Sequence, residues 1–225
     1  VSLMYGADAM GGVINIITKK GQDKPVSFSA SAGSYGQVNA KLGAGAKISG
    51  AEIYTSYSYL KTDGYRANSD YKGQNFIVSL NTGDIASLNL NFSRSDRGNP
   101  GVPVSDADLS STSTPFDRQS DQGTSISLSF SPKISDAFTP KLTVSDNLTE
   151  EKVHYANWDG TFSDGRYVSR ITQAELSTEI KNGRYGLVTA GLEFKRNYGE
   201  STGAGIHTVD NGAFYFRTSR FAATA

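Results

Sequence analysis

The sequence predicts an all-β protein: an antiparallel, up-and-down transmembrane β-barrel, of which this chain supplies a partial wall of roughly ten strands. Three observations predict this fold. Apolar and polar residues alternate along most of the 225-residue chain, and the alternating segments are long. Short connections between these segments alternate with long ones. Together they favour a membrane barrel over a soluble β-sandwich, whose strands are usually about 5–6 residues long.

The alternation is clearest at residues 86–93, where Ala, Leu, Leu and Phe alternate with Ser, Asn, Asn and Ser. Residues 26–32 and 126–130 repeat the pattern. Successive side chains of a strand point to opposite faces, so each segment has an apolar wall, which we expect to contact lipid, and a hydrophilic wall. The charged and amide side chains expected on the hydrophilic wall are Lys41, Lys47, Asn89, Asn91, Glu175, Glu179, Glu193 and Lys195.

The expected strands follow one another closely. They cover residues 26–33, 36–47, 52–61, 73–81, 85–95, 122–131, 138–156, 166–181, 184–199 and 212–222. Short turns are expected at 48–51, 82–84, 133–136 and 182–183, and long polar connections near 62–72, 96–121, 157–165 and 200–211. Because each hairpin reverses the chain, turns gather at one end and loops at the other, as in outer-membrane barrels. The short turn at 33–36, on the loop end, is the exception.

Aromatic residues lie near the loop ends of many expected strands. An aromatic ring is stable at the level of lipid headgroups, where its apolar body meets lipid and its edge meets water. Strand propensity alone is the other explanation for these residues. They are Tyr57, Tyr59, Phe92, Tyr155, Trp158, Tyr167, Phe194 and Tyr198.

Composition excludes several classes of function. Lys plus Arg equals Asp plus Glu at 22 each, which gives no electrostatic reason to expect a nucleic-acid partner. The absence of Cys excludes disulfides, Cys-type zinc sites and thiol catalysis. The two histidines, His154 and His207, have no sequence neighbours that form a Ser–His–acid group, and we expect neither catalysis nor a cofactor. No signal peptide opens the chain, so we expect any export signal to lie outside it.

The first twenty residues do not follow the barrel pattern. Gly11 and Gly12 permit a turn or a close backbone approach that a side chain would block. The strand expected at residues 13–18 is apolar on both faces except at Asn15, as in a buried strand.

This segment closely resembles the end of the plug domain of TonB-dependent outer-membrane receptors. The matching residues are Tyr5, Gly6, Ala9, Gly11, Gly12, Val13, Ile14, Asn15, Ile16, Ile17 and Thr18. The resemblance implies a structural role for this motif. It also implies that residues 1–24 are the C-terminal remnant of a plug and its linker, and that residues 25–225 are the N-terminal part of a barrel of about 22 strands with a plugged lumen. Residues 57–65 and 98–101 look, more weakly, like external loops of the vitamin B12 receptor branch.

What the resemblance implies for function is active uptake of a scarce metal chelate, a ferric siderophore or cobalamin, across the bacterial outer membrane. The implied partners are the chelate, outer-membrane lipid and the inner-membrane TonB complex, whose contact box is expected outside this chain. A passive porin or barrel adhesin is the alternative, but it leaves the motif at residues 5–18 unexplained. A barrel hydrolase is a third reading, which needs an acid–His group.

Two sets of side chains in the expected external loops are candidate ligands. Arginines beside aromatic rings can contact an anionic or aromatic chelate. This set is Tyr65, Arg66, Tyr71, Arg97, Phe116 and Arg118. Carboxylates on loops can bind calcium, although no spacing here resembles a known calcium loop and solvated loop charge is the simpler interpretation. The calcium candidates are Asp63, Asp70, Asp106 and Asp108.

Overall fold

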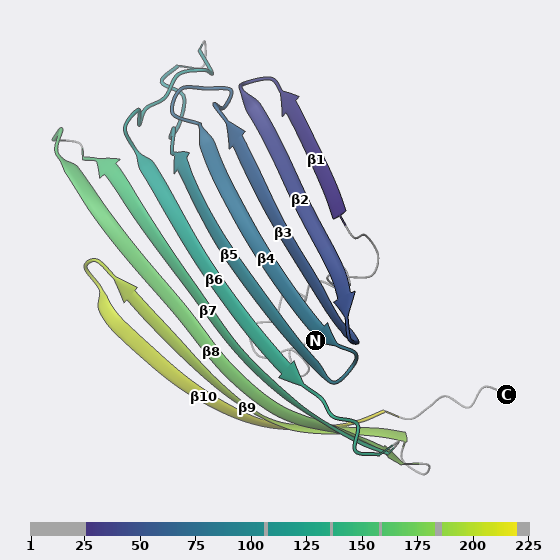
Figure 1. Ribbon diagram of the computed structural model, residues 1–225. Helices are drawn as coiled ribbons and strands as arrows, with labels where there is room; N and C mark the ends of the chain where they lie inside the picture. Colours follow the sequence, from purple (N-terminus) through teal and green to yellow (C-terminus); the bar gives the residue numbers. More distant parts are fainter. Residues whose placement is uncertain (1–25, 106–107, 136, 158, 183–185, 220–225) are drawn as a thin grey trace.

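The computed structural model describes residues 26–105, 108–135, 137–157, 159–182 and 186–219, which form ten long β-strands (Figure 1). They are β1 (Val26–Gly33), β2 (Gln37–Ile48), β3 (Ala51–Thr62), β4 (Tyr71–Thr82), β5 (Ala86–Gly98), β6 (Arg118–Phe130), β7 (Phe138–Ala156), β8 (Phe162–Asn182), β9 (Gly186–Ser201) and β10 (Gly205–Ser219). The motif at residues 5–18 lies outside the described residues. In the part of the chain that the structure describes, no α-helix has the length and hydropathy of a membrane-spanning helix.

All ten strands belong to one antiparallel sheet whose spatial order is the order of the sequence, β1 to β10. The sheet is curved, with β1 at one edge and β10 at the other (Figure 1). Since every strand pairs only with its sequence neighbours, each connection is a hairpin. This confirms the predicted all-β, up-and-down architecture.

The loop-end connections are shorter than the sequence predicted. The β5–β6 connection covers residues 99–117 rather than 96–121, and the β7–β8 connection covers 157–161 rather than 157–165. The long connection predicted at 200–211 is wrong, because only residues 202–204 separate β9 from β10. The polar residues of that segment are strand residues that find partners across the hairpin: Asp210 accepts two hydrogen bonds from Arg196, at 2.7 and 2.8 Å.

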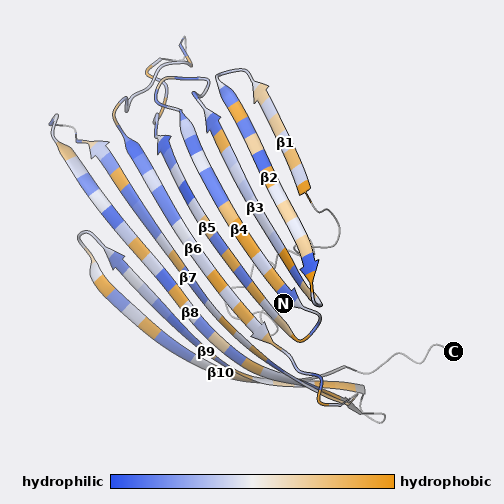
Figure 2. Ribbon diagram, viewed as in Figure 1, coloured by the Kyte–Doolittle hydropathy of each residue, from blue (hydrophilic) through white to orange (hydrophobic). Residues whose placement is uncertain are grey.

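Hydrophilic and hydrophobic residues alternate along most of the strands (Figure 2), so the sheet has a polar face and an apolar face. The polar face is the one that carries Asn89 and its register partners, and the apolar face carries Leu88 and Leu90. On the polar face, amides and hydroxyls bond across strands: Ser79 Oγ donates to Asn89 Oδ1 at 2.8 Å, and Asn75 Nδ2 donates to Asn91 Oδ1 at 2.6 Å. Ser79 is fully buried, so this wall is well packed even though its residues are small and hydrophilic.

The apolar face is exposed and continuous across strands. One register row joins Ile53, Leu80, Leu88, Leu128 and Val144, all on this face. Large apolar side chains are therefore turned outward on one side of the sheet, while hydrogen-bonded polar groups cover the other. That is the inverse of a water-soluble sheet, which buries its apolar face.

Toward the loop ends the apolar face changes character. A row of aromatic rings, formed by Tyr57, Phe76 and Phe92 on adjacent strands, ends the apolar section of β3 to β5. Beyond this row the same face carries charged residues, among them Lys61, Lys72 and Arg94. The apolar band therefore has a defined upper edge on these strands.

Candidate functional site

A hollow of about 460 Å³ lies on the polar face near the loop ends of β2 to β6. We call it the polar recess. Its lining includes Lys41, Tyr71, Ser95 and Asp121, which come from four different strands. The hairpin register brings them together, since the sequence separates Lys41 from Asp121 by eighty residues.

The Asp121 carboxylate of the polar recess is held in place by three neighbouring side chains. Its carboxylate accepts hydrogen bonds from Ser95 Oγ at 3.2 Å and from Gln119 Nε2 at 2.9 Å, and Arg97 Nη2 lies 3.5 Å from Oδ2. Three groups therefore fix the carboxylate, while the Arg97 side chain keeps 42% of its surface exposed. A guanidinium has five N–H donors, so Arg97 can bind a ligand in addition to Asp121.

Gly73 allows the Tyr71 ring to lie close to the wall of the recess. A Cβ atom at position 73 would lie 2.3 Å from the Tyr71 hydroxyl and 2.7 Å from its ring, closer than such atoms approach. Glycine at this position therefore leaves the space that the Tyr71 ring occupies. Tyr71 is also the register partner of Arg97, so a phenol and a guanidinium lie side by side on the polar face.

The recess thus offers a phenol and an oriented carboxylate, and the guanidinium of Arg97 pairs with that carboxylate. A guanidinium and a hydroxyl can donate to an anionic oxygen, and an aromatic ring can contact a flat or cationic group. Tyr71 and Arg97 are two of the six side chains predicted to contact a ligand. The sequence predicted both residues in loops, but Tyr71 lies in β4 and Arg97 lies in β5.

Arg66 occupies a different position, between two external loops. Its Nη2 donates to the carbonyl oxygens of Pro100 and Gly101 at 3.1 and 2.8 Å, and these residues belong to the β5–β6 loop. Arg66 therefore joins the β3–β4 loop to the β5–β6 loop. Tyr65, its neighbour, is 63% exposed at the surface of the same loop.

Arg118 and Phe116 lie away from the recess. Arg118 is the first residue of β6 and faces the apolar side, where it binds Asp70 through two hydrogen bonds of 2.6 and 2.9 Å. Through that pair Arg118 holds the pKa of the Asp70 carboxyl below its usual range. Phe116 packs edge-on against Phe162, with ring centroids 6.1 Å apart. The six predicted residues are therefore divided among the recess, the loop contacts and the opposite face.

The predicted calcium ligands are also separated. Asp63 pairs with Lys61 at 3.3 Å, Asp70 pairs with Arg118, and Asp108 accepts a hydrogen bond from the backbone N–H of Ser110. Asp106 lies outside the described residues. Within the residues that the structure describes, no three His, Cys, Asp or Glu side chains are grouped as a metal site requires.

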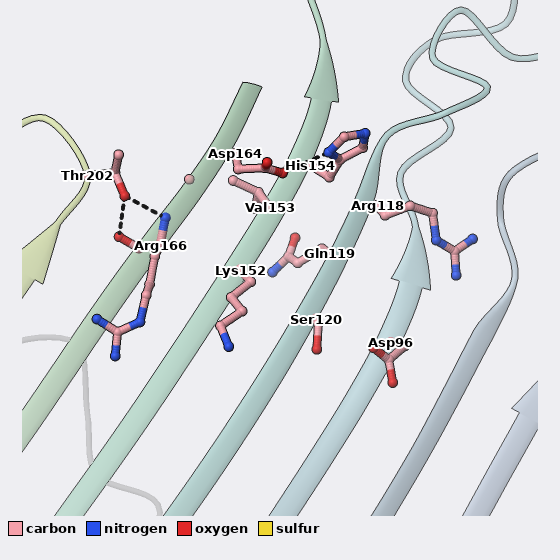
Figure 3. Close-up of a pocket in the computed structure, with 11 residues that line it drawn as sticks. Asp96, Arg118, Gln119, Ser120, Lys152, Val153, His154, Asp164, Arg166 and Thr202 are labelled. Carbon is pink, nitrogen blue, oxygen red and sulfur yellow. Dashed lines mark hydrogen bonds and ion pairs between the residues drawn. The ribbon is translucent and has the colours of Figure 1, made fainter. Parts of the chain in front are cut away.

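A second hollow, of about 410 Å³, lies beside β6, β7 and β8 near their loop ends (Figure 3). It contains a hydrogen bond that the sequence did not suggest: His154 Nδ1 lies 2.7 Å from Asp164 Oδ1, and the His154 ring stacks on Phe162 at 5.0 Å. The hairpin register could have predicted this contact, because residues 154 and 164 are opposite each other in β7 and β8. Ser120 also lines this hollow, but its hydroxyl makes no hydrogen bond to His154, so the contact between nucleophile and base that acyl transfer needs is missing.

No protein-family model matches the sequence, and no curated protein matches it. The structure, in contrast, is similar to the crystal structure of the siderophore receptor PiuA from Acinetobacter baumannii, with a TM-score of 0.74 over 97% of this chain at 14% sequence identity. The ferric citrate transporter FecA in its unliganded form gives a TM-score of 0.46 over 84% of this chain at 13% identity. The chain spans 41% of the PiuA chain and 40% of the FecA chain. The similarity to PiuA shows the fold: the ten-stranded sheet is similar to part of that receptor.

Proposed function

We propose that this chain is part of the barrel wall of an outer-membrane receptor that takes up a metal chelate. The observation that carries the proposal is the match of the whole two-faced sheet to a siderophore receptor, over 97% of this chain. A sheet with one exposed apolar face and one hydrogen-bonded polar face suits a wall between lipid and a hydrated lumen. Exposed apolar side chains such as Phe28 at 73% and Phe214 at 71% are costly in water and favourable in hydrocarbon.

The sequence motif at residues 5–18 supports the same proposal from another direction. It is similar to the end of a plug domain, and a plug is what distinguishes an energised receptor from an open pore. In this proposal the small polar side chains of the polar face, such as Ser79 and Asn89, face a plug and water. Uptake draws on the TonB complex through a part of the receptor outside this chain.

The polar recess is the proposed chelate-contacting part of this wall. Arg97 and Tyr71 lie near the loop ends of their strands, where a chelate arrives from outside. Ferric siderophores and cobalamin both carry oxygen-rich groups that a guanidinium and a phenol can bind, so the recess fits this class of cargo. The cargo is a substrate and is not held permanently by the protein.

The test uses the intact receptor and a panel of ferric siderophores and cobalamin. We expect Arg97→Gln to weaken binding of the cognate chelate by about tenfold, because a charge-assisted hydrogen bond contributes about 1.5–3 kcal/mol. Arg170→Gln is the matched control: Arg170 pairs with Asp146 on the apolar face of β8 and does not line the recess. Binding that survives both Arg97→Gln and Tyr71→Ala unchanged would exclude the recess as a chelate site.

Energy coupling is tested separately by uptake into cells. The proposal predicts that accumulation of the chelate stops when the proton gradient is collapsed. Uptake that continues without the gradient indicates a passive pore, and the absence of any chelate binding indicates an adhesin or another role.

A further inference from the structure

Three cationic side chains gather on the apolar face of β3, β4 and β5, just beyond its aromatic row. They are Lys61, Lys72 and Arg94, and we call them the cationic cluster. Lys61 and Lys72 are register partners on adjacent strands, and Arg94 is opposite Gln74, two residues along β4 from Lys72. All three side chains are solvent-exposed.

The cluster has a defined height relative to the apolar band. The aromatic row of Tyr57, Phe76 and Phe92 is uniform in exposure, at 40%, 41% and 43%. Arg94 is the next residue after Phe92 on this face, about 7 Å further along the strand. Aromatic rings mark the edge of the hydrocarbon, and Lys and Arg side chains just beyond that edge extend their charged ends into the headgroup layer.

The cluster carries more positive charge than its surroundings neutralise. Lys61 lies 3.3 Å from Asp63, and Arg94 lies 3.7 Å from Asp96. Lys72 forms no ion pair with any residue that the structure describes. Lys72 has Lys61 opposite it on β3, where the like charges repel, and Asp96 opposite it on β5. The three cations are therefore balanced by two carboxylates, Asp63 and Asp96, which leaves one positive charge in excess.

The same face of β7 to β10 has no such surplus. Arg166 pairs with Glu150 and Glu200 at 2.7 and 3.0 Å, and Lys152 pairs with Glu150 at 3.2 Å. Two further arginines are paired in the same way, Arg170 with Asp146 and Arg196 with Asp210. Exposed cations above the band are therefore neutralised within the protein on one part of the wall and left in excess on the other.

We propose that the cationic cluster binds the phosphate group of an anionic lipid in the adjoining membrane leaflet. The proposal rests on the proposed function, because it requires the apolar face to lie in lipid. A phosphate between Lys61, Lys72 and Arg94 accepts charge-assisted hydrogen bonds and removes the repulsion between the lysines. The acyl chains of the same lipid then lie along the exposed aromatic row below.

The experiment measures lipid binding to the intact receptor in neutral detergent by native mass spectrometry. Phosphatidic acid is the probe, and phosphatidylcholine at the same concentration reports binding without net charge. We expect Lys72→Gln to weaken phosphatidic acid binding by about fivefold, and the Lys61→Gln/Lys72→Gln double variant to weaken it further. Lys152→Gln, which removes a lysine with an exposure close to that of Lys61 from the ion-paired network of β7, is expected to leave it unchanged.

Three outcomes overturn the proposal. Equal binding by wild type and both cluster variants would remove the cluster as the site. Equal losses for Lys72→Gln and Lys152→Gln would show that general surface charge is responsible. Full displacement of phosphatidic acid by millimolar inorganic phosphate would show a free-anion site instead of a lipid site. Failure of the proposed function is detected separately. A receptor that does not insert into lipid vesicles contradicts the proposed function before any lipid-binding measurement is made.

Discussion

Three arginines in this chain show how strongly the register of a strand decides what a side chain can do. Arg66 binds carbonyl groups of a neighbouring loop, Arg97 pairs with Asp121 of the polar recess, and Arg118 binds Asp70 on the opposite face. The sequence alone suggested one role for all three. The alternation could have separated two of them, because Arg97 has the same parity as Asn89 in β5 and Arg118 has the same parity as Ile126 in β6. The strands were expected to end before reaching them.

The Asp70–Arg118 pair makes the stability of the contact between the β3–β4 loop and β6 depend on pH. Arg118 lowers the pKa of Asp70 in the folded protein below its value in the unfolded chain. The pair therefore contributes stability at pH values above the unfolded-state pKa, near 4, and this contribution is lost as the pH falls through the folded-state pKa.

Hydrogen exchange at the Gly98 amide, which donates to the Asp70 carbonyl at 3.0 Å, reports on this joint. After correction for intrinsic rates, we expect protection in the wild type to fall below pH 4. Asp70→Asn should show weaker protection at pH 7 and little further change on acidification. Identical pH profiles for the two proteins would contradict the role assigned to the pair.

Leu90 and Ser87 test the two faces at single residues of one strand. Leu90 is on the apolar face near the middle of the band of β5, and Ser87 is on the polar face beside a hollow of about 350 Å³. Leu90→Arg should destabilise the intact protein in a bilayer by roughly 2–4 kcal/mol, because it places a charge in hydrocarbon. Ser87→Arg should cost much less. Urea unfolding in lipid vesicles measures both, and equal losses would mean that the faces are assigned wrongly.

At the scale of elements, the β3–β4 and β5–β6 loops form one unit. The Asn68 amide is central to it, since Nδ2 donates to the carbonyl oxygens of Thr114 and Asp117 at 2.6 and 2.9 Å. The Ala67 amide adds a bond to the Ser110 carbonyl at 3.0 Å. Asn68 also has a φ of 54°, a left-handed conformation that Asn adopts more readily than most residues. Two independent requirements therefore favour Asn at this position.

Asn68→Asp separates these two requirements. Aspartate tolerates the same backbone conformation but replaces the N–H donors with oxygens that face carbonyl groups, so we expect the loop contact to lose about 1–3 kcal/mol. Limited proteolysis should then cut residues 99–117 faster, with the thermal unfolding of the barrel unchanged. Cleavage rates equal to those of the wild type would show that the two loops are held together by other contacts.

The strands could be predicted from the sequence, but several of their ends could not. Alternation along residues 86–93 or 126–130 reflects a physical period of two, and the ten strands are where it predicts them. The predicted ends are wrong where apolar and polar residues no longer alternate, as from Ile206 to Asp210 in β10. The pairing of Asp121 with Arg97 was likewise invisible, since it depends on the register of β5 and β6.

At the scale of the whole molecule, the account depends on one division of environments. In the proposed receptor, hydrocarbon is in contact with the apolar face, and water and a plug are in contact with the polar face. The proposed chelate site, the proposed lipid site and the order of the aromatic and charged rows are all interpreted through this division. The chain covers 41% of the length of the siderophore receptor that it matches. The test therefore uses the intact protein.

Site-directed spin labelling measures this division most directly, and the described chain helps because it contains no Cys. Single cysteines at residues 87 to 92 of β5, labelled in the intact protein in lipid vesicles, report their collisions with oxygen and with a water-soluble nickel chelate. The account predicts a period of two: Leu88, Leu90 and Phe92 favour oxygen, and Ser87, Asn89 and Asn91 favour the nickel chelate. High accessibility to the nickel chelate at all six positions would contradict it.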